Sequence, residues 1–192
     1  SEPENDDALI ALYRKGDDRA MARLFDRHRR KLFAFILHMA GRPDEADDVF
    51  QEVWYRAVSK LGSYKEKNFL AWLTRIAHNL IIDRWRSHKG NLSLDAEEED
   101  GGASLLERLP SDAPDPGRLA QTEDLLLKIS AAVKSLPGEQ REVFLMRVKE
   151  DLSFKEIAGI QGVSINTALA RMQYGLSKLR RVLEQERRAL KK

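Results

Sequence analysis

Residues 69–89 read FLAWLTRIAHNLIIDRWRSHK, and the interpretation of the whole chain depends on this stretch. Its apolar residues recur at three- and four-residue steps, which is the period of a helix that buries one face. The same step gathers an aromatic ring, an amide, a carboxylate and two guanidinium groups on a second face, at Trp72, Arg75, Asn79, Asp83 and Arg86. The stretch therefore predicts one long amphipathic helix with a polar face of mixed chemistry.

That polar face suits nucleic acid. Arginine neutralises phosphate, an amide reads a base edge, and an aromatic ring stacks on an unpaired base. The alternative is an ordinary surface helix whose polar face is solvated, because charge on an outer helix face is common. The helix alone leaves both interpretations open, and the neighbouring segments decide between them.

Composition limits the other possibilities. The chain has 192 residues, is 42% apolar and contains no cysteine, so it is long enough for one domain or two small ones and has no disulfide or thiolate metal site. The absence of cysteine fits a reducing cytoplasm. The acidic, polar start SEPENDDALI shows no secretory signal, and the longest apolar run, residues 32–37, is too short to cross a bilayer.

Charge is segregated along the chain. Residues 95–115 hold eight acids and one arginine, a net −7, so the rest of a chain with a total of +2 carries +9. Basic flanks around an acidic segment are typical of two polyanion-binding modules joined by a linker. The linker around this window also contains three of the six prolines and a Gly-Gly pair, and no helical or strand period survives in it except for a turn at residues 105–106.

The first half is expected to be helical. Helices are predicted at residues 7–14 and 19–40, and the basic cluster RHRRK at 27–31 is taken as a solvated face rather than a nucleic-acid contact. A third helix, starting at Pro43, presents an acidic outer face that suits docking on a basic protein, with simple solubility as the alternative. The residues of that face are Asp47, Asp48, Gln51, Glu52 and Tyr55.

The loop GSYKEKN at 62–68 leads into the central helix. Aromatic, lysine and asparagine residues beside a nucleic-acid-facing helix are suited to hold an extruded base, although most such loops are only connections. Its candidate residues are Tyr64, Lys65, Lys67 and Asn68, and Arg84 joins the candidates on the central helix.

The C-terminal part predicts a helix-turn-helix. Helices are expected at about 123–135 and 139–149, and then Ser153 and Glu156 form a capping box before a short helix. Gly162 suits the tight turn and Ser164 caps the following helix. From residue 164 to the end there are eight bases and two acids, a net charge that suits phosphate binding. An ordinary helical hairpin is the alternative.

Three functional classes compete at this point: a factor with two nucleic-acid surfaces, a helix-turn-helix regulator with a helical sensing or dimerisation domain, and an enzyme. A sensing domain has no need of a second nucleic-acid face, which disfavours the regulator. The four histidines have no metal-ligand spacing and there is no phosphate-cradling glycine loop, so neither catalysis, a metal nor a cofactor is expected.

Taken together, these motifs resemble the extracytoplasmic-function (group IV) sigma factors of bacterial RNA polymerase, in the sigma-70 family. DEADDVFQEVWYRA resembles region 2.2, the opening stretch resembles regions 2.3 and 2.4, and LPGEQREVFLMRVKEDLSFKEIAGIQGVSINTALARM resembles region 4. The resemblance implies an all-α chain with a region 2 bundle at 1–88, an acidic flexible linker at 89–122 and a region 4 helix-turn-helix at 123–192.

The resemblance also implies roles. The acidic face of the third helix would bind the clamp helices of the largest catalytic subunit of core polymerase, and region 4 would also meet its flap region. The central helix and its loop would recognise and melt the minus-ten element. An anti-sigma factor and promoter DNA are further implied partners, and the location is the bacterial cytoplasm, with retention at the membrane by an anti-sigma factor as a variant.

The recognition helix departs from the family pattern. The family often has T-V-K-S-R where this chain has Thr167-Ala168-Leu169-Ala170-Arg171, and Gln161 replaces a commonly apolar residue. Leu169 is expected either to contact thymine methyl groups or to extend a core stripe at 165, 169, 172, 176 and 179. The implied minus-thirty-five contacts are Ser164, Asn166, Thr167, Leu169, Ala170, Arg171, Tyr174 and Lys178.

Overall fold

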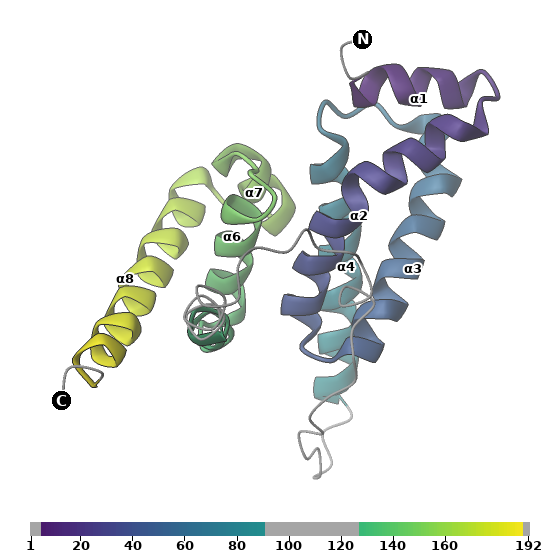
Figure 1. The fold of residues 1–192 in the computed structure, drawn as a ribbon. Coiled ribbons are helices and arrows are strands. Elements are labelled where there is room, and N and C mark those ends of the chain that lie inside the picture. The colour runs from purple at the N-terminus through teal and green to yellow at the C-terminus, as the bar shows by residue number, and fades with distance from the viewer. Residues whose placement is uncertain (1–4, 91–126, 190–192) are drawn as a thin grey trace, which may run out of the picture. The chain divides into compact units, whose positions relative to one another are not determined.

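The computed structural model describes residues 5–90 and 127–189, and every regular element in those ranges is helical. The chain divides into two compact units, Ser1–Leu106 and Glu107–Lys192, which are considered separately here (Figure 1). The predicted acidic linker at 89–122, including the turn at 105–106, lies outside the described residues from position 91 onward. The all-α expectation is confirmed for the part that the structure describes.

The N-terminal unit is a bundle of four α-helices. Two of them, α1 (Asp6–Arg14) and α2 (Asp18–Ala40), are followed by α3 (Pro43–Lys60), a short 3₁₀ turn η1 (Leu61–Ser63) and α4 (Phe69–Gly90). α2 packs against α1, α3 and α4, so it is the central member of the unit (Figure 1). α4 extends two residues beyond the predicted domain boundary at 88.

Local chemistry explains where these helices begin and end. Asn5 and Asp17 cap α1 and α2 by accepting hydrogen bonds from backbone amides of the first turn. Gly41 ends α2 in the left-handed conformation, which glycine adopts without steric penalty, and Pro43 opens α3. The predicted helix boundaries of this unit therefore lie within about one residue of those in the structure.

The core of the N-terminal unit is built around aromatic rings. Phe25, Phe33, Phe50, Trp54, Tyr64, Phe69 and Trp72 form a chain of ring contacts with centroids 4.9–6.4 Å apart. Tilted and edge-on ring pairs contribute beyond the area they bury. The chain of rings links α2 and α3 to the loop before α4, so the position of that loop is coupled to the core.

The basic cluster at 27–31 is a solvated face except at Arg29, which is half-buried, and at His28. Arg27, Arg30 and Lys31 are exposed, as expected, but His28 is only 8% exposed. Its ring contacts Phe69 edge-on, and its Nε2 lies 2.8 Å from Oδ2 of Asp6 on α1. The expectation of a fully solvated cluster was therefore wrong at His28, which helps to hold α1 on the bundle.

The C-terminal unit contains α6 (Gly138–Val148), α7 (Phe154–Gln161) and α8 (Ile165–Ala189), with residues 127–134 also helical. α8 packs against both α6 and α7. The capping box of Ser153 and Glu156 and the left-handed Gly162 at the turn are present as predicted. The Ser164 hydroxyl accepts a hydrogen bond from the Thr167 amide at the start of α8.

The core stripe predicted for α8 was wrong at three positions. Ile165, Leu169 and Leu176 are 46%, 37% and 43% exposed, whereas Ala168 is fully buried. Gly175 is also buried, and a Cβ there would lie 3.7 Å from side-chain carbons of Leu136 and Gln140. Gly175 lets α8 lie close to Gln140 of α6, so the helix turns Ala168, Gly175 and Leu179 inward and leaves the side chains of Ile165, Leu169 and Leu176 exposed.

Candidate nucleic-acid and polymerase interfaces

The acidic face of α3 has the outward orientation that the sequence predicted. Asp48 and Gln51 are exposed, and Tyr55 is 71% exposed. Asp47 is half-buried, and Glu52 pairs with Arg56 one turn later at 2.6 Å. Val49 and Val53 are buried beneath this face, so its residues have fixed positions while their polar groups reach solvent.

The polar face of α4 divides into an open half and a tethered half. Asn79 is exposed, and the side chains of Asp83 and Arg86 are 72% and 79% exposed. Their carboxylate and guanidinium groups lie 4.0 Å apart, and such exposed pairs contribute little. These three side chains occupy the second half of the helix and are available to a partner.

The tethered half holds Trp72 and Arg75. Trp72 is half-buried, with its ring 4.9 Å from that of Tyr64, and Arg75 bonds Glu66 at 2.7 Å. Both side chains therefore connect α4 to the preceding loop. Arg84 is half-buried and borders a small hollow with Trp85, away from the series Asn79, Asp83 and Arg86.

The loop at 62–68 makes contacts with the core and with α4 that its sequence did not predict. Tyr64 is 6% exposed, so the expectation that its ring stacks on an extruded base does not fit its position in the core. Burial, aided by nearby Asp7 and Glu66, raises the pKa of Tyr64 well above its usual value. The Asn68 side chain accepts a hydrogen bond from the Ala71 amide, whereas Lys65 and Lys67 are exposed. The solvent-facing residues of the loop are therefore Gly62, Ser63 and the two lysines.

Arg171 on α8 belongs to a polar network rather than to an open surface. Its guanidinium bonds Glu139 of α6 and Gln161 of α7, each at 2.8 Å, and its side chain is 20% exposed. Gln161 in turn donates to a carboxylate oxygen of Glu142 at 2.6 Å. Gln161, the departure from the family pattern, is thus the link between three helices. This geometry suits a role in holding α6, α7 and α8 together better than it suits the predicted DNA contact by Arg171.

The other predicted α8 contacts are unevenly placed. Ser164, Asn166, Thr167, Leu169 and Tyr174 are exposed, and Ala170 is half-buried. Lys178 is exposed but donates a hydrogen bond to the Ser135 carbonyl at 2.7 Å, which ties α8 to the turn before α6. The exposed residues among these predicted contacts therefore lie in the first turn of α8 and at Leu169 and Tyr174.

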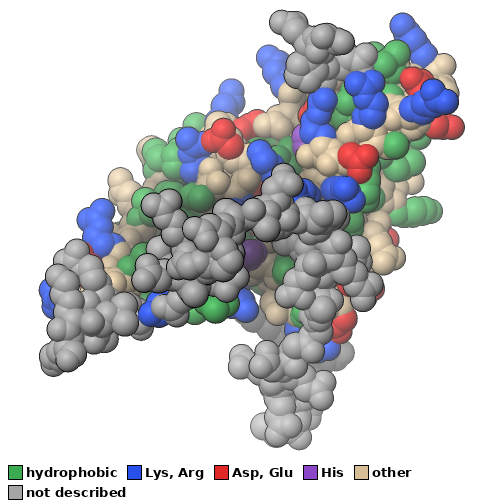
Figure 2. Space-filling model, viewed as in Figure 1, with side chains coloured by type: hydrophobic (Ala, Val, Ile, Leu, Met, Phe, Trp, Pro, Cys, Tyr) green, Lys and Arg blue, Asp and Glu red, His purple; other side chains and the backbone are tan. Residues whose placement is uncertain are grey.

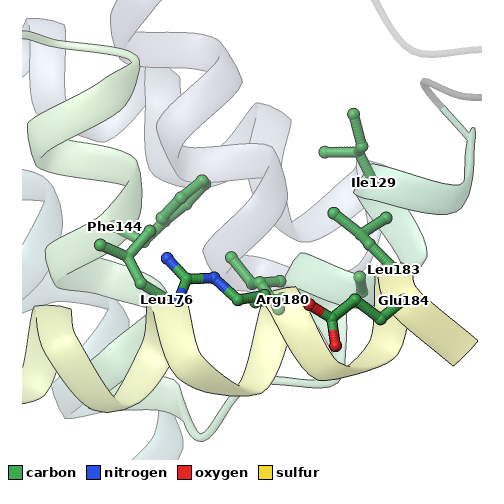
Figure 3. A pocket seen from close by; sticks show the side chains of 8 residues that line it. Ile129, Phe144, Leu176, Arg180, Leu183 and Glu184 are labelled. Atoms are coloured by element: carbon green, nitrogen blue, oxygen red, sulfur yellow. The ribbon is translucent and has the colours of Figure 1, made fainter.

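Sequence reasoning missed a groove along the second half of α8. The groove has a volume of about 530 Å³. Figure 3 shows Leu176, Arg180, Leu183 and Glu184 along one side of α8, with Phe144 and Ile129 contributed by other segments. The seven-residue spacing of Leu176 and Leu183 is the signal in the sequence that marks this face.

Two further classes of site are lacking in the part of the chain that the structure describes. No cluster of three or more histidine, aspartate or glutamate side chains is arranged to bind a metal ion there. Within residues 5–90 and 127–189, no helix combines the length and apolar character needed to span a bilayer.

Figure 2 shows lysine and arginine side chains over α1 and α2, interleaved with acidic ones.

Comparison with known proteins identifies both units. The model for Sigma-70 region 2 matches residues 24–90, and that for Sigma-70, region 4 matches residues 126–179. The chain is 31% identical over 176 residues to the ECF RNA polymerase sigma factor SigW of Bacillus subtilis, covering 91% of this chain and 94% of that protein.

Solved structures share the fold. CnrH, in complex with the cytosolic domain of CnrY, is 23% identical with a TM-score of 0.65, over 95% of this chain and 99% of that one. The sigma factor RpoE from Bartonella quintana, in complex with the anti-sigma factor NepR, is 20% identical with a TM-score of 0.65, over 85% and 96%. The chain belongs to the ECF sigma factors of the sigma-70 family, non-enzymatic RNA polymerase subunits that direct promoter-specific initiation of transcription.

Proposed function

We propose that the two units divide promoter recognition between them. The N-terminal unit docks on core polymerase and recognises and melts the minus-ten element, and the C-terminal unit binds the minus-thirty-five element. One observation carries the first half of this proposal. The loop with Lys65 and Lys67 is fastened to the polar face of α4 by the Tyr64–Trp72 ring contact and the Glu66–Arg75 ion pair. The loop and the helix face thus form one surface.

The composition of that surface suits single-stranded DNA. Opening a duplex costs stacking of about 1.4 kcal/mol per step. A protein that hydrolyses no nucleotide must offset this by binding the open state preferentially. Asn79 offers an amide to a base edge, and Arg86, Lys65 and Lys67 offer positive charge to the backbone. Base capture is worth about 1–3 kcal/mol per base, which is comparable with the cost of one step.

The proposed contacts with core polymerase involve both units. The acidic face of α3, with Asp48, Gln51 and Tyr55 exposed, has charge and apolar area suited to the clamp helices of the largest catalytic subunit. In the C-terminal unit, the apolar groove beside Leu176 and Leu183 is suited to the flap region, because the DNA-facing start of α8 stays open when the groove is occupied.

An anti-sigma factor is the third proposed partner. The RpoE structure contains such a partner, NepR. In this chain, Tyr55 and Val58 expose apolar area on α3, 71% and 42% respectively, and a protein that covered them would block polymerase docking. The proposed place of action is the bacterial cytoplasm, with retention at the membrane when the partner is itself anchored there.

Transcription from a randomised promoter library tests the proposal. The purified chain is mixed with core polymerase, and the promoters that yield transcripts are sequenced. We expect a bipartite consensus that appears only when both components are present. A duplex motif selected equally well by the chain without polymerase would instead favour a helix-turn-helix regulator.

A further inference from the structure

Helix α1 contacts the 62–68 loop, which belongs to the surface proposed to melt the promoter. It lies before residues 24–90, the part of the chain matched by the region 2 family model. Arg14, in its last turn, reaches across to the segment between α3 and α4. Its Nη2 donates to the Leu61 carbonyl at 3.1 Å and also to the Tyr64 carbonyl, and its Nε lies 3.4 Å from the former.

These two carbonyls bracket Gly62 and Ser63, where the loop begins. Other contacts that hold the loop are the Tyr64 ring in the core, the bond from the Ser63 hydroxyl to the Lys60 carbonyl, the Glu66–Arg75 pair and the Asn68 cap. Arg14 also holds the first half of the loop, because its guanidinium donates hydrogen bonds to the backbone carbonyls of Leu61 and Tyr64. A planar guanidinium can donate to both carbonyls at once, whereas a lysine ammonium offers no such fork.

The helix that carries Arg14 is itself anchored. Leu9 and Ile10 are buried against the bundle, and Asp6 accepts bonds from His28 at 2.8 Å and Arg27 at 2.6 Å. Burial raises the pKa of Asp6, but the hydrogen bonds from His28 and Arg27 outweigh it and leave that pKa below its usual value. Asp6 is therefore ionised at neutral pH, and α1 is a fixed platform rather than a loose arm.

We propose that Arg14 is a positioning residue for promoter melting, which acts by holding the 61–68 loop in the geometry that receives an extruded base. The inference rests on the proposed melting function. A loop that is already ordered loses less conformational freedom when it binds, so the open complex forms more readily. Arg14 does not touch DNA in this proposal, and its effect passes through the carbonyls of Leu61 and Tyr64.

The test compares Arg14→Ala and Arg14→Lys with Lys15→Ala, an exposed neighbour whose loss removes the same charge. Each full-length variant is assembled with core polymerase, and opening is followed by the fluorescence of a base analogue in the minus-ten element. Both duplex and pre-melted bubble templates are used. Melting temperature, core affinity and hydrogen exchange of loop amides are measured in parallel.

We expect Arg14→Ala to slow opening on the duplex by roughly threefold to tenfold, the range for ordering one or two flexible groups. Loop amides should exchange faster, Arg14→Lys should be intermediate, and Lys15→Ala should match the parent. A bubble template should restore most of the signal. Opening at the parental rate by Arg14→Ala would overturn the inference. It would also be overturned if Arg14→Ala lowered core affinity and opening on the bubble template as much as opening on the duplex.

Asn79→Ala in the same assay distinguishes a failure of the role of Arg14 from a failure of the proposed melting function. A defect in Asn79→Ala with normal opening in Arg14→Ala overturns only the role of Arg14. Normal opening in both variants overturns the role of Arg14 together with the melting function assigned to the α4 face.

Discussion

Polar side chains predicted to bind partners are exposed in the N-terminal unit, whereas two of those in the C-terminal unit bond other parts of the same unit. In the N-terminal unit, the predicted contact residues Asp48, Asn79 and Arg86 point into solvent from helices whose other faces are buried. In the C-terminal unit, the predicted contact residue Arg171 is 20% exposed and holds α6, α7 and α8 together, and Lys178 bonds a backbone carbonyl. An arginine or lysine on a recognition helix is thus not by itself evidence of a DNA contact.

The difference accompanies the way the helices of the C-terminal unit are joined. α7 has only eight residues, and Arg171 of α8 bonds both Gln161 of α7 and Glu139 of α6. The charged hydrogen bonds through Arg171 and Gln161 therefore help to fix the angle of α8 relative to α6 and α7. The N-terminal unit has an extended aromatic core, and its outer faces are free for partners. The comparison predicts that substitutions in the first unit change binding, whereas substitutions in the network of the second unit change stability first.

The largest expected effect is on core polymerase binding. Reversing Asp48 and Glu52 together to lysine should weaken core affinity by tenfold or more, a rough figure for opposing charge across a complementary interface. The reason is that both side chains share the outward face of α3, and the buried Val49 and Val53 beneath them are unchanged. Affinity is measured by titration of labelled chain with core polymerase.

Asp26→Lys, a reversal of an exposed acid on α2 that pairs with Arg29 at 3.2 Å, controls for the charge change of one reversal. Circular dichroism melts should show that the folded unit survives in each variant. Core affinity equal to that of the parent in the double reversal would remove the α3 face from the docking surface.

A smaller effect is expected from Arg171→Ala. Hydrogen bonds to charged groups contribute about 1.5–3 kcal/mol each where they are well formed, so we expect the C-terminal unit to lose about 2 kcal/mol of unfolding free energy. The salt dependence of duplex binding should keep its slope, because no phosphate contact is lost. The measurements are urea unfolding and a salt titration of minus-thirty-five duplex binding.

Glu139→Gln and Arg181→Ala sharpen this prediction. Glu139 is the partner of Arg171, so its substitution should reproduce part of the stability loss, whereas the exposed Arg181 should not. A slope reduced by about one in Arg171→Ala, with unchanged stability, would show that Arg171 binds a phosphate instead.

The smallest effect is expected from Tyr64→Phe. The Tyr64 hydroxyl is buried and has no hydrogen-bond partner among the residues that the structure describes, so its removal breaks no bond. Stability should change by less than about 0.5 kcal/mol or rise slightly, and opening of promoter DNA should be unaffected. Tyr64→Ala, which removes the ring from the aromatic core, should be strongly destabilising. A melting defect in Tyr64→Phe would return the hydroxyl to the DNA-binding surface.

Much of the fold was readable from the sequence because its signals are local. The caps at Asn5, Asp17 and Ser153, the left-handed Gly162 and the helical period of the apolar residues lie within a few positions of the features they specify. They predicted the helices and the turn of the helix-turn-helix. The outward faces of α3 and α4 followed from the same periodicity.

What the sequence did not show are contacts outside a helical period. The ring of Tyr64 turns back onto Phe69 and Trp72, five and eight residues later, across the junction of loop and helix, and nothing near Arg14 marks the carbonyls 47 and 50 residues away. The stripe on α8 failed at three positions because the small residues Ala168 and Gly175 are buried there instead of Ile165, Leu169 and Leu176, with Gly175 lying close to Gln140 of α6. Hydrophobicity predicts burial poorly when close helix approach requires small side chains.

The central claim is that the open face of α4 melts the minus-ten element. The most direct measurement is the fluorescence of a base analogue in the upstream part of that element, with Asn79→Ala and the parent on duplex and bubble templates. Gln185→Ala, an exposed amide on α8, is the control.

The account predicts that Asn79→Ala retains fold and core affinity but loses roughly fivefold or more of the opening signal on the duplex, because a base-edge contact is worth about 1–3 kcal/mol. A bubble should rescue much of the loss if opening is the failed step, and a base-specific loss should persist there if Asn79 mainly reads sequence. Opening at the parental level by Asn79→Ala on the duplex template would contradict the claim.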